Sequence, residues 1–85
     1  MPIRWDPLKN EWLKRTRGTS FEEVLRAKFI TIEEHPTKPH QMLMLFELNG
    51  YILTVPYVQK GDELFLKTIF PSRKYTKRWR LGEFK

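Results

Sequence analysis

The sequence predicts an α+β domain with its helices on one face of a mostly antiparallel sheet of four to five strands. Two of these helices are N-terminal, and a short basic helix lies at the C-terminus. Helix-start signals gather in the first third of the chain, and β-patterned segments separated by turn residues fill most of the rest. With 85 residues, the chain is expected to form a single domain over residues 1–85 with a small, aromatic-rich core.

The first helix is marked at both ends. A short edge strand is expected over residues 3–5, and Asp6-Pro7 then supplies an N-cap and a proline at the first helical position. The helix should run over residues 7–16, and Gly18 should end it in the left-handed conformation. Its buried stripe is expected to consist of Leu8, Trp12 and Leu13.

The second helix has the stronger start signal. Ser20-Phe21-Glu22-Glu23 is a capping box, with Ser20 as the N-cap and Glu23 at the third helical position. Helical spacing continues to Lys28. Capping accounts for Glu22 and Glu23 without a catalytic role, and Trp5 and Trp12 are expected in the core.

The remainder of the chain is predicted to form a sheet. Asn49-Gly50 is the preferred dipeptide of a tight hairpin turn, which would pair Leu48 with Tyr51 and Phe46 with Leu53. Pro56 should bend its strand near the end. The predicted strands cover residues 29–34, 42–48, 51–58 and 63–70, followed by the basic helix from Arg73 to Trp79.

Composition limits the possible functions. The net charge is +6, and basic residues gather at both ends, in residues 1–17 and 71–85, the latter including Lys85. Such a chain concentrates near polyanions, although many small domains carry this charge without a partner. Since there is no cysteine, disulfides and thiolate zinc sites are excluded. No stretch resembles a membrane span or a secretory signal, so we expect a cytoplasmic protein without a membrane partner.

Three phrases resemble the BrnT family, whose members are small toxins of bacterial type II toxin–antitoxin operons. They are Trp5-Asp6-Pro7-x-Lys9-Asn10, then Arg17-Gly18-x-Ser20-Phe21-Glu22-Glu23, and Ile69-Phe70-Pro71-Ser72-Arg73 before the basic tail. The resemblance implies a RelE-like fold, metal-independent endoribonuclease activity without a cofactor, RNA as the target, and a DNA-binding antitoxin of the ribbon-helix-helix type. Many members carry histidine where this chain has Arg17.

Cleavage of RNA without a metal requires proton transfer and charge stabilisation at the phosphate, which a basic site with a tyrosine could supply. Arg73 is the first candidate, because it directly follows the predicted last strand. The catalytic candidates are Arg73, Lys74, Lys77, Arg78, Lys67 and Tyr57. The candidates for RNA binding alone are Arg17, Arg80 and His40, and no metal site is expected.

Each candidate also has a simpler explanation. Lys74, Lys77 and Arg78 could form a solvated helix face or contact an antitoxin, Tyr57 could belong to the core, and His40 could be an exposed loop residue. The same basic surface would suit a non-catalytic module that binds nucleic acid or protein, or a gyrase-directed toxin of the same superfamily. The sequence leaves these alternatives open, because binding and cleavage both favour arginine and lysine.

Overall fold

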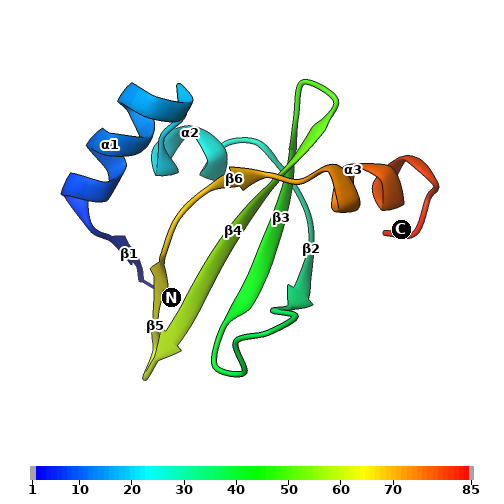
Figure 1. Ribbon diagram of the computed structural model, residues 1–85. Helices are drawn as coiled ribbons and strands as arrows, with labels where there is room; N and C mark the ends of the chain where they lie inside the picture. Colours follow the sequence, from blue (N-terminus) through cyan, green and yellow to red (C-terminus); the bar gives the residue numbers. More distant parts are fainter. Residues whose placement is uncertain (1, 85) are drawn as a thin grey trace.

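The computed structural model describes residues 2–84 and forms an α+β fold with a mixed six-stranded sheet (Figure 1). Lys85 of the basic tail lies outside the described residues. The elements in chain order are β1 Ile3–Trp5, α1 Pro7–Arg17, α2 Phe21–Leu25, β2 Lys28–Glu34, β3 Met42–Leu48, β4 Tyr51–Lys60, β5 Glu63–Leu66, β6 Phe70–Pro71 and α3 Arg73–Arg80.

Helix α1 begins and ends as predicted, but it buries a different face. The Asp6 carboxylate accepts a hydrogen bond from the Leu8 N–H, and Gly18 is left-handed with φ 68°. Leu13 is fully buried, whereas Leu8 is 79% exposed and Trp12 is 37% exposed. The predicted stripe was therefore wrong at two positions, because Asn10 occupies the buried face beside Leu13 and turns Leu8 and Trp12 outward.

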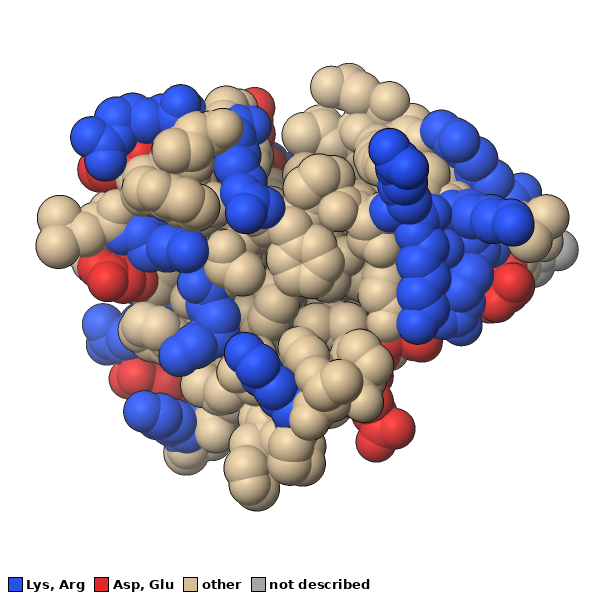
Figure 2. Space-filling view, in the orientation of Figure 1, with Lys and Arg blue, Asp and Glu red and all other residues tan. Residues whose placement is uncertain are grey.

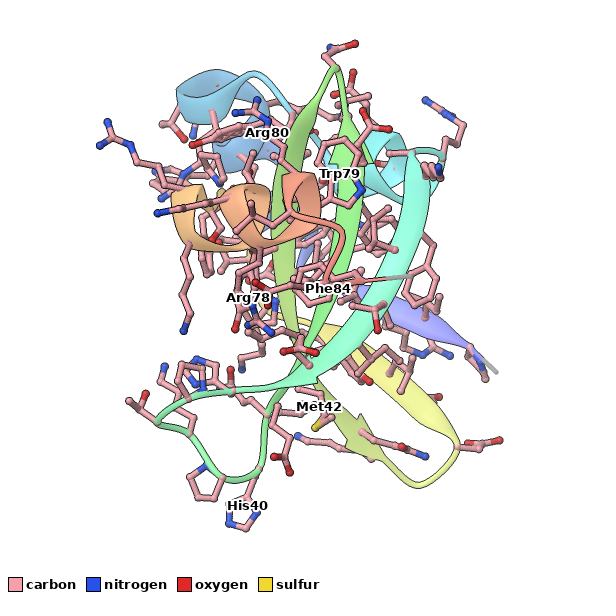
Figure 3. All side chains as sticks on the ribbon, turned by 90° about the vertical axis from the view of Figure 1, so that its right-hand side faces the viewer. His40, Met42, Arg78, Trp79, Arg80 and Phe84 are labelled. Carbon is pink, nitrogen blue, oxygen red and sulfur yellow. The ribbon has the colours of Figure 1, made fainter. Side chains whose placement is uncertain are left out.

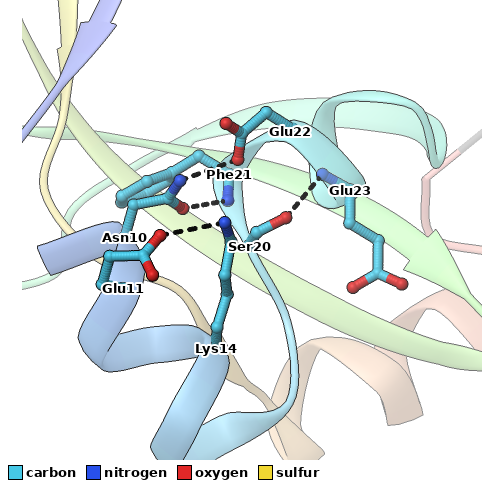
Figure 4. Close-up of polar contacts among 7 residues, drawn as sticks. All are labelled: Asn10, Glu11, Lys14, Ser20, Phe21, Glu22 and Glu23. Carbon is cyan, nitrogen blue, oxygen red and sulfur yellow. Dashed lines mark hydrogen bonds and ion pairs between the residues drawn. The ribbon is translucent and has the colours of Figure 1, made fainter. Parts of the chain in front are cut away.

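Asn10 ties α1 to the start of α2 (Figure 4). Its side-chain oxygen accepts a hydrogen bond from the Phe21 N–H at 2.8 Å, and its amide donates to the Glu22 carboxylate at 2.7 Å. The Ser20 hydroxyl caps α2 by accepting from the Glu23 N–H. The predicted cap is confirmed, but α2 ends at Leu25 rather than Lys28, because Lys28 already pairs with Glu47 in the sheet.

The sheet order is β1-β5-β4-β3-β2, with β6 paired to β4. The predicted hairpin register is confirmed, with Leu48 opposite Tyr51 and Phe46 opposite Leu53. Strand β1 is an edge strand, as expected, and it runs parallel to β5. The remaining pairs are antiparallel, so the sheet is mixed and has more strands than the four to five expected.

The predicted strand over residues 63–70 is instead split into β5 and β6. Strand β4 runs without a break to Lys60, so Pro56 does not interrupt its own strand. Pro56 accepts a hydrogen bond from the Lys67 N–H at 2.8 Å, but it has no N–H to donate in return. The neighbouring chain leaves the ladder at this point and pairs with β4 again at Phe70.

The helices lie on two faces of the sheet, not on one as predicted. Successive residues of β3 point to opposite faces, and both faces are buried. One core holds Leu13 of α1 and Phe21 and Val24 of α2 against the sheet. The other holds Tyr75 of α3, with Trp79 packed against it. Tertiary packing of Tyr75 therefore decides where α3 lies, which its local sequence did not reveal.

Candidate nucleic-acid interface

Helix α3 is fixed to the hairpin of β3 and β4 by its own polar residues. The Ser72 hydroxyl caps the helix, and the Ser72 N–H donates to the Ile52 carbonyl. The buried Thr76 hydroxyl accepts from the Ile52 N–H at 2.9 Å and donates to the Ser72 carbonyl at 2.6 Å. Arg80 donates to the Gly50 carbonyl at 3.0 Å. The helix therefore holds its exposed side chains in a defined position beside the turn.

Three exposed basic residues follow one face of α3. Arg73, Lys77 and Arg80 lie at the spacing of successive helical turns and line one hollow with Tyr51 and Thr76. The volume of this hollow is about 360 Å³. We call Arg73, Lys77 and Arg80 the basic row. A phosphate in this hollow would meet cationic donors from one rigid element.

Lys74 and Arg78 do not line this hollow, although the sequence suggested that they share a helix face with Lys77. The Arg78 guanidinium pairs with Glu83 at 2.8 Å and Glu33 at 3.5 Å and lies over the Phe84 ring at 4.8 Å (Figure 3). The hydrogen bond to Glu83 raises the pKa of Arg78. Arg78 therefore packs the C-terminal turn against β2.

A larger hollow of about 610 Å³ adjoins the basic row. Tyr51 lines both hollows, which together we call the groove. The larger hollow is lined by Arg17, Gly18, Thr19, Glu23, Leu48, Asn49, Tyr51, Leu53, Ile69 and Pro71. Figure 2 shows basic side chains on both sides of the uncharged surface between the α1–α2 layer and α3. The larger hollow is lined by Pro71 of β6 and by the preceding Ile69. Figure 1 shows β6 between the α1–α2 layer and α3.

Arg17 is anchored at the wall of the larger hollow. Its guanidinium donates to the Ile69 carbonyl at 3.0 Å and lies over the Trp12 ring at 5.6 Å. These two contacts join α1 to the segment between β5 and β6. The remaining guanidinium N–H groups can serve as donors in the groove.

Glu23 and Tyr51 are groove residues that sequence reasoning did not select. Glu23 is the acid among the residues lining the larger hollow, and within residues 2–84 its carboxylate has no hydrogen bond or ion pair. Figure 4 shows its side chain pointing away from the Asn10–Glu22 contact. Sequence reasoning missed Glu23 because its place in the cap of α2 already accounted for it. The only sequence signal for Tyr51 was its position next to the Asn49-Gly50 turn, which indicates an exposed end of the sheet.

Besides Lys74 and Arg78, three predicted site residues lie outside the groove. Tyr57 is 7% exposed within the core beneath α1 and α2, where burial raises the pKa of its hydroxyl. Lys67 and His40 line another hollow with residues at the end of β4. Figure 3 shows His40 at the opposite end of the molecule from Arg80. The structure therefore brings together Arg17, Arg73, Lys77 and Arg80, but not these three.

Residues 2–84 contain no cluster of three or more histidine, aspartate or glutamate side chains placed to hold a metal ion. Over the same residues, no helix is long and apolar enough to cross a membrane.

The fold is similar to that of a bacterial toxin that acts as a ribonuclease. The crystal structure of the ribonuclease toxin BrnT from Brucella abortus matches this chain with a TM-score of 0.57 and 26% sequence identity, covering 85% of this chain and 96% of that chain. The resemblance indicated by the sequence motifs is thereby confirmed as a similarity to this toxin. Comparisons with family models and with curated proteins find no match.

Proposed function

We propose that the protein is the toxin of a type II toxin–antitoxin system and a metal-independent endoribonuclease that cleaves RNA in the groove. The observation that carries this proposal is the basic row on α3, held beside Tyr51 by the hydrogen bonds of Thr76 and Arg80. The similarity to a ribonuclease toxin supports the same reading.

The chemistry follows from the charges. Attack of a ribose 2′-hydroxyl, whose proton passes to water, forms a bond to the adjacent phosphorus and breaks its bond to the 5′ oxygen. This attack places additional negative charge on the phosphoryl oxygens in the transition state. Fixed guanidinium and ammonium donors stabilise that charge more strongly than the charge of the ground state. Arg73 and Lys77 are assigned this role, with Arg80 binding a neighbouring phosphate. Tyr51 lines both hollows, and its hydroxyl is the proposed donor to the leaving 5′ oxygen.

The test is induced expression in a bacterial host while growth and RNA integrity are followed, together with cleavage of RNA by the purified protein. Arg73→Ala and Lys77→Ala should each reduce the cleavage rate by about 10²–10³-fold, as expected when one transition-state donor is removed. Lys60→Ala, which removes an exposed charge at the far end of β4, is the matched control and should cleave normally. Circular dichroism checks that each variant is folded.

Other outcomes would change the assignment. Full cleavage by folded Arg73→Ala and Lys77→Ala variants would remove the basic row from the active site. Growth arrest with intact RNA would favour a gyrase-directed toxin. RNA binding with a steep salt dependence but no cleavage would favour a non-catalytic binding module.

We further propose that a DNA-binding antitoxin neutralises this protein by covering the groove in the cytoplasm. A segment with acidic residues would match the basic row and exclude RNA by occupying the same surface. Co-expression of the adjacent small reading frame should restore growth, and a ribbon-helix-helix pattern in that frame is expected.

A further inference from the structure

The larger hollow differs chemically from the basic row beside it. Its apolar lining includes Leu53, Ile69 and Pro71, and Tyr51 adds an aromatic ring. Glu23 contributes a carboxylate and Arg17 a guanidinium at the same hollow. An apolar site with one acceptor group and one cationic donor is suited to a flat heterocycle with polar edges, and less suited to a second phosphate.

We propose that this hollow is a nucleobase pocket that selects guanine, with Glu23 as the residue that determines specificity. The inference rests on the proposed function, since it concerns a base of the same RNA strand. A phosphate bound at the basic row would lie next to Tyr51, and the base attached to that nucleotide could enter the larger hollow. Aromatic rings beside a basic surface are the usual means of holding an unpaired base.

The choice of guanine follows from comparing the hydrogen-bond donors and acceptors of the four bases with the two acceptor oxygens of Glu23. An ionised carboxylate only accepts hydrogen bonds, and it can accept two parallel ones. The Watson–Crick edge of guanine presents two adjacent donors, N1–H and N2–H₂. Adenine and cytosine each place a ring acceptor beside their single amino group, and uracil places one N–H between two carbonyl groups. Only guanine therefore matches both oxygens of Glu23.

The other polar groups of the hollow fit the opposite edge of guanine. Arg17 is held by Ile69 through one nitrogen, which leaves further N–H groups for the O6 and N7 acceptors. Thr19 also lines the hollow, and its hydroxyl oxygen has no hydrogen-bond partner within the described chain. Buried hydroxyls normally have a partner, and a bound base would supply one.

The test is calorimetric titration of the full chain with the 3′-monophosphates of guanosine, adenosine, cytidine and uridine. Guanosine 3′-monophosphate should bind at least about tenfold more tightly than the other three, which is the usual discrimination of a bidentate base contact. Glu23→Gln should abolish this preference, because the amide presents one donor and one acceptor in place of two acceptors. Glu34→Gln, which removes an equal charge from exposed β2, is the matched control.

Equal binding of the four nucleotides, or an unchanged preference in folded Glu23→Gln, would overturn the inference. Cleavage of RNA oligonucleotides that differ in one guanine separates this inference from the proposed function. Cleavage that ignores guanine would retain the ribonuclease and remove the base pocket. A guanosine preference that depends on Glu23, in a protein that cleaves nothing, would retain the pocket and remove the ribonuclease.

Discussion

Asn10 is a polar side chain on the buried face of α1, beside Leu13. It is 4% exposed and is the acceptor for the buried Phe21 N–H. Asn10→Ala should lower the free energy of unfolding by about 1–3 kcal/mol, because it leaves that N–H without a partner. Urea denaturation measures the change. Lys9→Ala, the adjacent substitution on the same helix, should alter stability far less, and an equal loss in both variants would contradict this role.

Glu22 makes stability depend on pH through the same contact. The hydrogen bond from Asn10 lowers the pKa of Glu22 from its ordinary value of 4.5. A carboxyl whose pKa is lower in the folded state stabilises the fold above its unfolded pKa, and this contribution is lost as the pH falls through the folded value. The free energy of unfolding of the native chain minus that of Glu22→Gln should therefore stay constant near neutral pH. This difference should decrease as the pH falls below about 4.5.

Urea titrations of both proteins between neutral and acidic pH would measure this difference. A difference in stability that does not vary with pH would show that Glu22 acts only through packing.

At the scale of the element, one of the contacts that hold α3 is the buried hydroxyl of Thr76. Thr76→Val keeps the shape of Thr76 but removes the hydroxyl that pairs with the buried Ile52 N–H. We expect a loss of about 1–3 kcal/mol in stability, together with weaker RNA binding, because the basic row moves with the helix. Unfolding and RNA-binding titrations measure the two effects. Thr76→Ser, the control, should preserve both stability and RNA binding. Normal RNA binding by Thr76→Val would show that this contact of α3 does not position the basic row.

At the scale of the whole molecule, local signals predicted the features that depend on a few neighbouring residues. The caps of α1 and α2 and the Asn49-Gly50 register are of this kind, since each is set by side-chain and turn chemistry within the segment. The buried face of α1, the layer occupied by α3 and the division of the last strand depend on distant partners. These features were predicted incorrectly because their causes lie in other elements.

The candidate site likewise combines residues that local sequence signals could identify with residues whose place depends on distant partners. Arg17, Arg73, Lys77 and Arg80 could be selected from charge and from the family motifs. The separation of these residues from Lys74 and Arg78 could not be predicted, because it depends on Tyr75 entering the core on one side of α3. Glu23 could be identified as a groove residue only from the structure, since a capping motif already accounts for its place in the sequence.

Pro56 has an effect that extends beyond its own strand. An amide hydrogen at this position could complete the ladder with Lys67, and a continuous last strand would use the backbone groups of residues 67–69 in sheet pairing. Because that hydrogen is absent, Ile69 lies in the crossing segment between β5 and β6, where its carbonyl receives the Arg17 guanidinium. The missing amide hydrogen of Pro56 thus leaves the Ile69 carbonyl available to Arg17, and this contact holds a cation of α1 at the wall of the larger hollow.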